Sequence, residues 1–432
     1  MSPVETGSLI IAVLLVLLVL GMPIAFALIT SGMVGIYITR GPGGFDYLLS
    51  TFPYSNLANF AYVVVPLFLL MSQMAFATGM SKRAFEAAST LTSGLKGGLA
   101  TASVFACAIF STVSGSSIAT ASSIARVAIP EMRAAGYSNR LSAASVAAGG
   151  TLGVLIPPSS ILVIYGLATG TSIVQLFIGA LIPGIITAIA YMAGIILVGY
   201  ISPRSIGNPV AQPRVTLRQR LSSILMTWEA ALLFTLVIGS IYLGLATPNE
   251  AAAIGAFAMV VLTLFRRNWA RLTWEGLRQS GSVTCAVFGL IIGAGLFSIA
   301  LTTSRLPTEL ALYVSSFDVS PTLLVLLILL PFLFLGAFID GFSMILLTMP
   351  IVFPIIQNAG VNPVLFGILV VKSVEIGLIT PPVGLNVFVV KGAAPDLPLQ
   401  DVFIGCIPFV LLEIALIVLF VMFPGLVLWP LQ

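Results

Sequence analysis

Two proline pairs, Pro157-Pro158 and Pro381-Pro382, each interrupt a stretch that is otherwise apolar enough to form a membrane helix. Proline has no backbone N–H, and its ring clashes with the carbonyl group four residues back, so two prolines in a row break a helix. In a bilayer the freed backbone groups find no water, and such a break is tolerated only where it lines a cavity or binds a ligand. These two breaks limit the possible folds more than any other feature of the sequence.

The two breaks belong to a repeated unit. Pro157 and Pro381 lie 224 residues apart. The same spacing relates three further pairs of identical residues, which are Pro130 and Pro354, Gly136 and Gly360, and Glu5 and Glu229. The sequence therefore predicts a duplication that runs the length of the protein.

Composition places this duplicated chain in a membrane. Hydrophobic residues make up 59% of the 432 residues, charged residues only 7%, and there is no histidine, whereas a soluble globular protein carries about 25% charged residues. Several apolar runs exceed the roughly 20 residues that cross a bilayer as a helix, and they do not alternate as barrel strands do. We therefore expect an all-α polytopic membrane protein. The absence of histidine excludes a Ser–His protease, and no Walker loop indicates ATP binding, so we expect no enzyme.

We predict an inverted repeat of about ten transmembrane helices plus two re-entrant hairpins. The first repeat is 1–202, with a hairpin at 98–130 and a broken helix at 141–169; a cytoplasmic connector follows at 203–222; the second repeat is 223–432, with a hairpin at 321–358 and a broken helix at 363–390. Continuous spans are expected at 8–20, 23–39, 55–79, 173–201, 224–245, 249–265, 282–302 and 402–428, with a separate basic segment at 266–278. The first hairpin is inferred from a polar, Gly-containing centre inside an apolar stretch, which fits two half-length legs better than one span.

The distribution of charge predicts the topology. Lys and Arg collect in cytoplasmic loops, and placing both termini outside puts every one of the 18 basic residues on the cytoplasmic side except Arg40, Arg305 and Lys372. The loop at Gly136 is then cytoplasmic, while the equivalent loop at Gly360 is external. The two repeats are therefore predicted to be inverted.

Few polar side chains lie at membrane depth. Asp340, at the tip of the second hairpin, would be costly there unless it met a cation. Ser and Thr at the first tip fit either ligands or the small residues that let helices pack closely. Lys372 and Glu375 are three residues apart on one helix and can neutralise each other, which favours a structural pair. Glu413 and Glu229 are placed near span ends as solvated or partnered charges.

These residues carry a resemblance to a known family. The motifs are Ser114-Gly115-Ser116-Ser117-Ile118-Ala119-Thr120, then Pro130-Glu131-Met132 with Gly136-Tyr137, then Gly150-Thr151-Leu152-Gly153-Val154-Leu155-Ile156-Pro157-Pro158-Ser159, and Thr380-Pro381-Pro382-Val383-Gly384-Leu385-Asn386 in the second half. In this order they resemble the large membrane subunit (DctM-like) of TRAP transporters, over essentially the whole chain.

The resemblance implies a function. Members of this family are sodium-coupled importers of organic acids, such as C4-dicarboxylates and sialic acid, in the inner membrane of bacteria and in archaea. They work with a small four-helix membrane subunit and a periplasmic solute-binding protein, and their two hairpins and two broken helices slide as an elevator against a scaffold. Because this chain begins at its first span, we expect the small subunit to be a separate polypeptide.

The resemblance also implies binding residues. Sodium ions, with no other cofactor, would bind at Ser114, Ser116, Gly153 and Pro157, and at Asp340, Thr380 and Gly384. Substrate would be contacted by Ser117, Thr120, Pro158, Ser159, Gly341, Ser343, Pro381, Pro382 and Asn386. Freed carbonyls and a carboxylate are the oxygen ligands that suit a small cation, and half-helix N-termini attract a carboxylate substrate.

Two other functions remain open at this point. A stand-alone anion transporter of the divalent-anion/sodium or arsenite-type families shares the inverted hairpin plan and would transport without partners. A channel would need a continuous polar path, whereas the breaks favour an occluded site at the midplane. The sequence does not identify the organic acid.

Overall fold

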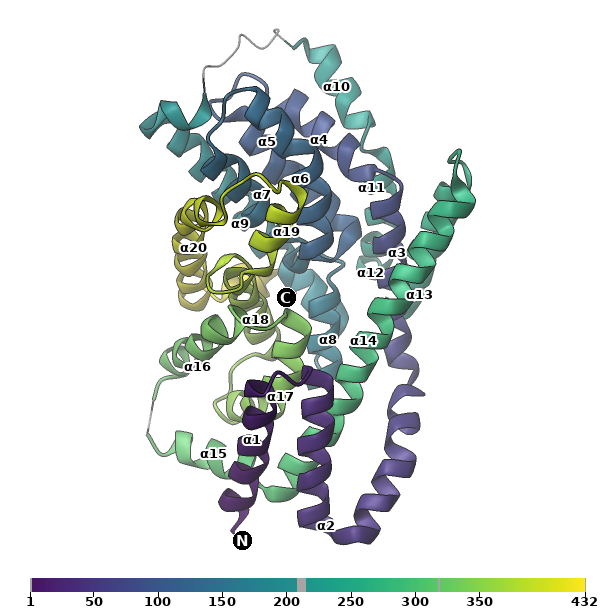
Figure 1. The fold of residues 1–432 in the computed structure, drawn as a ribbon, viewed down its shortest axis with the longest axis vertical. Helices are drawn as coiled ribbons and strands as arrows, with labels where there is room; N and C mark the ends of the chain where they lie inside the picture. Colours follow the sequence, from purple (N-terminus) through teal and green to yellow (C-terminus); the bar gives the residue numbers. More distant parts are fainter. Residues whose placement is uncertain (1, 208–214, 318, 432) are drawn as a thin grey trace.

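A computed structural model describes residues 2–207, 215–317 and 319–431 of the protein (Figure 1). These residues form helices and connecting turns without a β-strand, which confirms the all-α class. Residues 208–214 of the expected connector, Arg214 among them, lie outside the described residues.

The first half holds the first hairpin and the first broken helix. Its helices are α1 (Pro3–Val19), α2 (Ile24–Leu57), α3 (Val64–Ala77), α4 (Met80–Leu91), α5 (Gly98–Ser114), α6 (Ser117–Ala134), α7 (Asn139–Leu155), α8 (Ser160–Thr169) and α9 (Ile173–Ile201), with 3₁₀ turns at Phe60–Val63 and Pro203–Ile206. Helices α5 and α6 meet at a two-residue tip, and α7 and α8 are the two halves of one helix interrupted at residues 156–159.

The second half follows the same order. Its helices are α10 (Leu217–Leu225), α11 (Trp228–Phe234), α12 (Ser240–Tyr242), α13 (Pro248–Leu264), α14 (Trp269–Ser304), α15 (Leu306–Ser315), α16 (Pro321–Gly336), α17 (Gly341–Asn358), α18 (Pro363–Ile379), α19 (Leu385–Ala393), α20 (Leu399–Met422) and α21 (Gly425–Leu428), with a π turn at Thr235–Gly239 and a 3₁₀ turn at Trp429–Leu431. Here α16 and α17 meet at residues 337–340, and residues 380–384 separate α18 from α19.

Among the described residues, six helices are long and apolar enough to cross a membrane, and eight spans result if each of two bent helix pairs counts as one. Four further apolar helices, α1, α5, α13 and α16, fall just short of that length, with 16 or 17 residues each. The ten crossings expected from the sequence remain a prediction.

Three expected boundaries are wrong. The span expected at 55–79 begins later, because residues 55–57 are the end of α2 and α3 begins at Val64 after a 3₁₀ turn. Helix α2 does not end at residue 39 but bends at Gly41, whose φ of +69° lies in the left-handed region, and then continues through Pro42 to Leu57. The basic segment 266–278 is not separate from the following span, because most of it forms the first turns of the 36-residue helix α14. In the last case a charged, amphipathic sequence simply extends the apolar helix.

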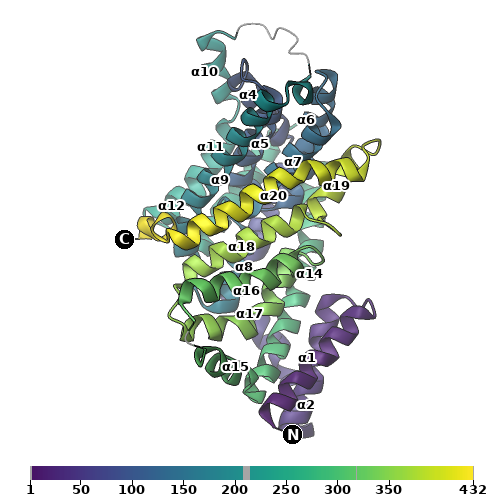
Figure 2. The same ribbon diagram turned by 90° about the vertical axis from the view of Figure 1, so that its left-hand side faces the viewer.

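The two halves interlock around the broken helices. The first hairpin packs its α6 on α7 and also on α19, which belongs to the second broken helix. The second hairpin packs α16 on α18 and α17 on α8, which belongs to the first broken helix. Helices α7 and α18 contact each other, and α18 and α20 lie side by side across the middle of the molecule (Figure 2). Each hairpin is thus held by pieces of both repeats.

Close backbone contacts seat the second hairpin on its broken helix. Gly336 is the last residue of α16 and faces Gly377 of α18; a Cβ added at Gly377 would lie 2.3 Å from the carbonyl carbon of Gly336. A Cβ atom does not approach a carbon atom this closely without displacement of the backbone. This junction therefore requires glycine at position 377.

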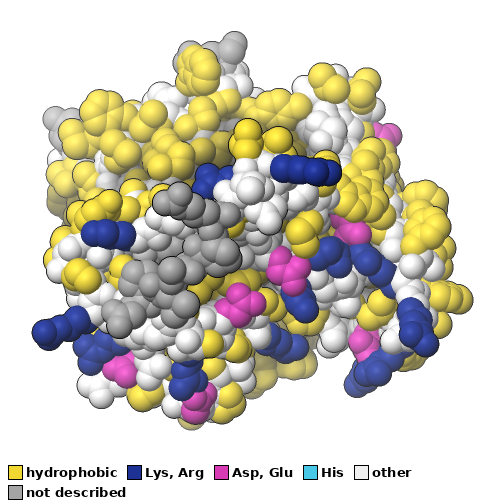
Figure 3. Space-filling model, turned by 90° about the horizontal axis from the view of Figure 1, so that it is seen from above, with side chains coloured by type: hydrophobic (Ala, Val, Ile, Leu, Met, Phe, Trp, Pro, Cys, Tyr) yellow, Lys and Arg dark blue, Asp and Glu magenta, His cyan; other side chains and the backbone are white. Residues whose placement is uncertain are grey.

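Charged side chains are confined to part of the surface. Seen from the end that carries α4, α5 and α10, basic and acidic side chains gather on one side of the view, and the opposite side is almost entirely hydrophobic (Figure 3). Ion pairs join the two repeats near the ends of their helices: Arg133 of α6 binds Asp396, and Arg140 Nε of α7 lies 2.9 Å from Asp401 Oδ1 of α20. Arg133 also lowers the pKa of Asp396 below its ordinary value, chiefly through this hydrogen bond.

We predict that the C-terminal ends of α6 and α17 lie on opposite sides of the membrane. Ala134 and Asn358 occupy equivalent positions, 224 residues apart, and both are exposed. Single cysteines at these positions, in a background without the native three, should be labelled by an impermeant thiol reagent in intact cells only at position 358. Both should be labelled after permeabilisation, and labelling of both in intact cells would refute the inverted topology.

We predict that Gly377→Ala destabilises the purified chain by about 1–3 kcal/mol, the usual cost of overpacking a filled interior. The matched control is Gly281→Ala on α14, where a Cβ would have no neighbour within 4 Å and alanine favours the helix by about 1 kcal/mol. Thermal melting in detergent should show a lower midpoint for the first variant and an unchanged or higher one for the second. If Gly377→Ala melts at the same temperature as the wild type, the contact between α16 and α18 can adjust to a Cβ atom without loss of stability.

Candidate ion and substrate site

The first hairpin tip is a cluster of hydroxyl groups. Gly115 takes a left-handed conformation after α5, and the Ser116 side chain caps α6 by accepting a hydrogen bond from the Ala119 N–H at 3.4 Å. Ser114 Oγ lies 2.6 Å from Thr120 Oγ1, and both side chains are buried. Two hydroxyl groups and the turn backbone therefore converge at the tip.

This tip rests directly on the first helix break. The Ser160 N–H, freed at the start of α8, donates to the Gly115 carbonyl at 3.3 Å. Gly153 of α7 faces the Ser116 carbonyl and the Thr120 hydroxyl so closely that an added Cβ would lie 2.6 and 2.8 Å from them. Ser159 is fully buried and donates to the Val154 carbonyl across the break. Most of the predicted residues of the first site are thus brought together.

At the second tip, Asp340 caps a helix. Its Oδ1 accepts hydrogen bonds from the Phe342 N–H at 3.0 Å and the Ser343 N–H at 3.1 Å, and its Oδ2 accepts one from the Ser343 hydroxyl at 2.5 Å. A carboxylate is favourable at a helix N-terminus. This structural role was not expected from the sequence, although an aspartate directly before a helix is a typical N-cap.

The second break contacts this tip by the backbone. The Val383 N–H donates to the Ala337 carbonyl at 3.2 Å. Thr380 donates its hydroxyl hydrogen to the Ile376 carbonyl at 2.6 Å, and among the described residues no hydrogen bond joins it to Asp340. Pro381 and Pro382 are exposed, whereas Gly384 is buried at the start of α19. Tip and break are adjacent, while the two predicted side-chain ligands each bind within their own segment.

Two other predicted substrate contacts lie between the repeats. Asn386 on α19 is fully buried and donates through Nδ2 to the Ala147 carbonyl of α7 at 3.1 Å. Its Oδ1 has no hydrogen-bond partner among the described residues. Gly341 is buried against Ile161 of α8. Asn386 therefore offers a buried acceptor beside the first broken helix, and Gly341 belongs to the packed interior.

The atoms that could coordinate a cation at both junctions are oxygens. Hydroxyl groups and carbonyls form the first, and a carboxylate, a hydroxyl and carbonyls form the second. Hard cations prefer such ligands. The part of the chain that the structure describes has no group of three His, Cys, Asp or Glu side chains that could hold a metal ion.

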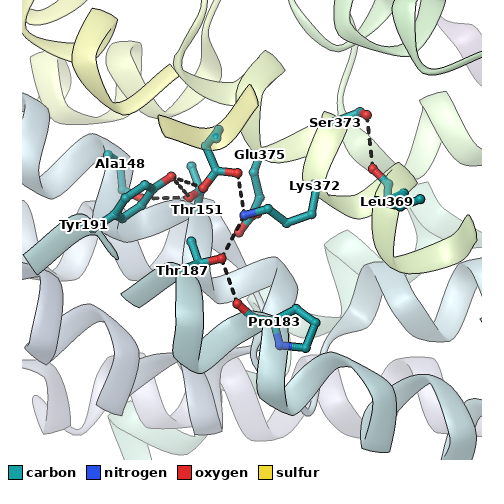
Figure 4. A network of polar contacts seen from close by, with 10 residues as sticks. Ala148, Thr151, Pro183, Thr187, Tyr191, Leu369, Lys372, Ser373 and Glu375 are labelled. Atoms are coloured by element: carbon teal, nitrogen blue, oxygen red, sulfur yellow. Dashed lines mark hydrogen bonds and ion pairs between the residues drawn. The ribbon is translucent and has the colours of Figure 1, made fainter. Parts of the chain in front are cut away.

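A buried charged network lies beside these junctions (Figure 4). The expected Lys372–Glu375 pair is present, with 2.7 Å between Nζ and Oε2, but Lys372 also binds Glu413 and donates to Thr187 at 3.0 Å. The placement of Glu413 near a span end is wrong: it lies inside the 24-residue helix α20 and is fully buried. A lone acid in the middle of an apolar helix was the signal for this network. Glu229 is partnered, by Arg83 and Arg266.

Comparison with known proteins identifies the family. The family described as "Tripartite ATP-independent periplasmic transporter, DctM component" matches residues 11–426. A C4-dicarboxylate TRAP transporter large permease protein of Pseudomonas aeruginosa is 35% identical over 369 residues, 85% of each chain. A sialic acid TRAP transporter large permease protein of Vibrio cholerae is 31% identical over 94% of each chain, and a 2,3-diketo-L-gulonate TRAP transporter large permease protein of Escherichia coli is 31% identical over 96% of each.

Solved structures agree at the level of the fold. The Alcanivorax borkumensis YdaH transporter superposes with a TM-score of 0.65 at 18% identity and 90% coverage of each chain. Neisseria gonorrhoeae MtrF gives a TM-score of 0.62 at 15% identity, with 98% of this chain covered and 95% of MtrF. With the family match over nearly its whole length and the hairpin–break pairs in place, the chain belongs to the DctM family and is the large permease subunit of a tripartite ATP-independent periplasmic (TRAP) transporter.

Proposed function

We propose that this permease couples sodium binding to the import of an organic acid. The observation that carries the proposal is that each hairpin tip closes on a helix break, where hydroxyl groups, carbonyls and the Asp340 carboxylate converge. Sodium would bind at Ser114, Ser116, Gly153 and Pro157, and at Asp340, Thr380 and Gly384. A small cation lowers the cost of keeping a carboxylate and bare carbonyls out of water.

The substrate would bind between the junctions as an anion. The N-termini of the half-helices α8 and α19 carry partial positive charge, which attracts a carboxylate. The relatives from Pseudomonas aeruginosa, Vibrio cholerae and Escherichia coli are named for C4-dicarboxylate, sialic acid and 2,3-diketo-L-gulonate, all of which bear a carboxylate. The proposed substrate class is therefore a small organic acid.

The proposed setting is the bacterial inner membrane, with both termini periplasmic and with two partners. One is a small membrane subunit, and the other is a periplasmic solute-binding protein that delivers the acid. The hairpins and broken helices would move as one elevator body, since α6 and α19, and α17 and α8, pack across the two repeats. The alternative, transport by this chain alone, predicts uptake without either partner.

We predict that Asp340→Asn abolishes sodium-driven uptake in proteoliposomes or makes it independent of sodium concentration. Asparagine caps a helix about as well as aspartate, so this variant keeps the start of α17 and removes only the charge. The matched control is Thr348→Ala on the same helix, which deletes a hydroxyl that donates to the Met344 carbonyl and should leave the sodium dependence unchanged. Unchanged sodium dependence of Asp340→Asn would make the residue a helix cap and no ligand.

We predict a milder effect for Thr380→Ala. Its hydroxyl donates to the Ile376 carbonyl, which leaves the oxygen lone pairs available to a cation. The sodium concentration for half-maximal uptake should rise several-fold while the maximal rate stays near that of the wild type. A fall in maximal rate at unchanged sodium dependence would instead indicate a role in the structure of the break.

We predict that uptake requires all three components. Vesicles with this chain alone should take up no organic acid, and uptake should appear when the small subunit and the acid-loaded binding protein are both added. Omitting either should reduce uptake to background. Uptake by the chain alone would support the stand-alone alternative.

A further inference from the structure

The buried network contains more negative than positive charge. Lys372 and Glu375 extend from α18, Glu413 from α20, and Thr187 and Tyr191 from α9. All five side chains are completely buried. Figure 4 shows the polar ends of Lys372, Glu375, Thr187 and Tyr191 converging between these helices, and Glu413 joins them through its contacts with Lys372 and Tyr191. One ammonium group faces two carboxyl groups here.

The hydrogen bonds account for almost every polar atom of the network. The ammonium group of Lys372 forms ion pairs with Glu375 Oε2 and Glu413 Oε2 and donates a hydrogen bond to Thr187 Oγ1. Tyr191 donates its hydroxyl hydrogen to Glu413 Oε1, and Thr187 donates its own to the Pro183 carbonyl at 2.8 Å. Every donor of the five side chains is therefore engaged. The acceptors differ, because one carboxylate oxygen, Glu375 Oε1, has neither a hydrogen bond nor an ion pair among the described residues.

Within the described residues, no other charge balances the excess carboxylate. Among the helices packed against α18, the sequences of α8, α9, α16, α17 and α21 contain no Asp, Glu, Lys or Arg. Arg140 at the start of α7 pairs with Asp401 at the start of α20, and Lys391 at the end of α19 binds the carbonyls of Pro395 and Leu397. With both acids ionised, one negative charge would stay uncompensated in a fully buried site, which is strongly unfavourable.

We propose that Glu375 is a proton-binding site, with a neutral carboxylic acid whose Oε1–H donates to the Thr151 hydroxyl of α7. Thr151 lies in the same cluster (Figure 4), with its Oγ1 3.4 Å from the Tyr191 hydroxyl oxygen. It donates its own hydrogen to the Ala148 carbonyl at 2.7 Å, so its oxygen is free to accept. The proton satisfies the one orphan oxygen, and Lys372 and Glu413 remain as a balanced ion pair. Glu413 is the ionised member because both of its oxygens already face donors.

The proton would join the two broken helices. Glu375 lies on α18 two residues before Gly377, where α18 touches the second hairpin, and Thr151 lies on α7, which carries the first hairpin. Loss of the proton would set an unpaired carboxylate against α7, a state that favours water entry and separation of the two helices. The site is therefore a proton-dependent link within the body that the hairpins and broken helices form.

Infrared spectroscopy of the purified full-length chain tests the proposal without relying on transport. The protein has 14 Asp and Glu residues. Only those that stay protonated at neutral pH give the C=O stretching band of a carboxylic acid. In an ester-free detergent we expect one such C=O band, which shifts in deuterated water and on ¹³C labelling of glutamate. The band should vanish in Glu375→Gln, whose amide can replace the protonated carboxyl in the same hydrogen bonds.

Two further variants locate the proton. Glu413→Gln should also remove the band, because Glu375 then becomes the sole counter-ion of Lys372 and ionises. Glu229→Gln is the matched control, since Glu229 is buried but balanced by Arg83 and Arg266, and the band should persist. Absence of the band in the wild type, or its persistence in Glu375→Gln, would overturn the proposal. If Glu375→Gln fails to fold, the wild-type and Glu413→Gln spectra still decide, because a band that persists in the latter contradicts the charge balance.

Discussion

The fold depends on how an interrupted helix satisfies its backbone in a dry interior. At both breaks a freed N–H donates to the carbonyl of a hairpin tip: Ser160 to Gly115 and Val383 to Ala337. In a membrane no water replaces such partners. Each hairpin is therefore required to complete its broken helix, and the polar atoms left over at the junction are available to an ion. The same few atoms therefore complete the broken helices and supply possible ligands for an ion.

This constraint also explains why the two repeats interlock. A broken helix has two halves with different directions, so one half can stay with its own hairpin while the other reaches the opposite one. Asn386 illustrates this arrangement, since it lies on the second half of one broken helix and binds Ala147 on the first half of the other. Two hairpins and two broken helices then share one interior, as a rigid moving unit would require.

The sequence predicted features that follow from local chemistry. The proline pairs indicated the breaks, and composition indicated a helical membrane protein. In the structure Gly41, with a positive φ, bends α2 without ending it. Local patterns could not show this, because a left-handed glycine can precede either a loop or a new helical run. They also could not show that Asp340 is satisfied by its own helix, or that Glu413 faces Lys372, since long-range partners depend on packing between helices. A carboxylate within an apolar helix indicates only that some partner exists.

The buried network raises the question of why an interior would hold charges at all. Well-packed apolar side chains often stabilise a protein as much as a buried ion pair, because the pair must first be desolvated. An apolar contact between α18 and α20, however, tolerates sliding and rotation, whereas Lys372 can reach Glu375, Glu413 and Thr187 together in only one arrangement of three helices. The charges thus fix the position of α18 along its axis, and with it the place where its break meets the second hairpin. We therefore expect this network to contribute more to the precise placement of that junction than to stability.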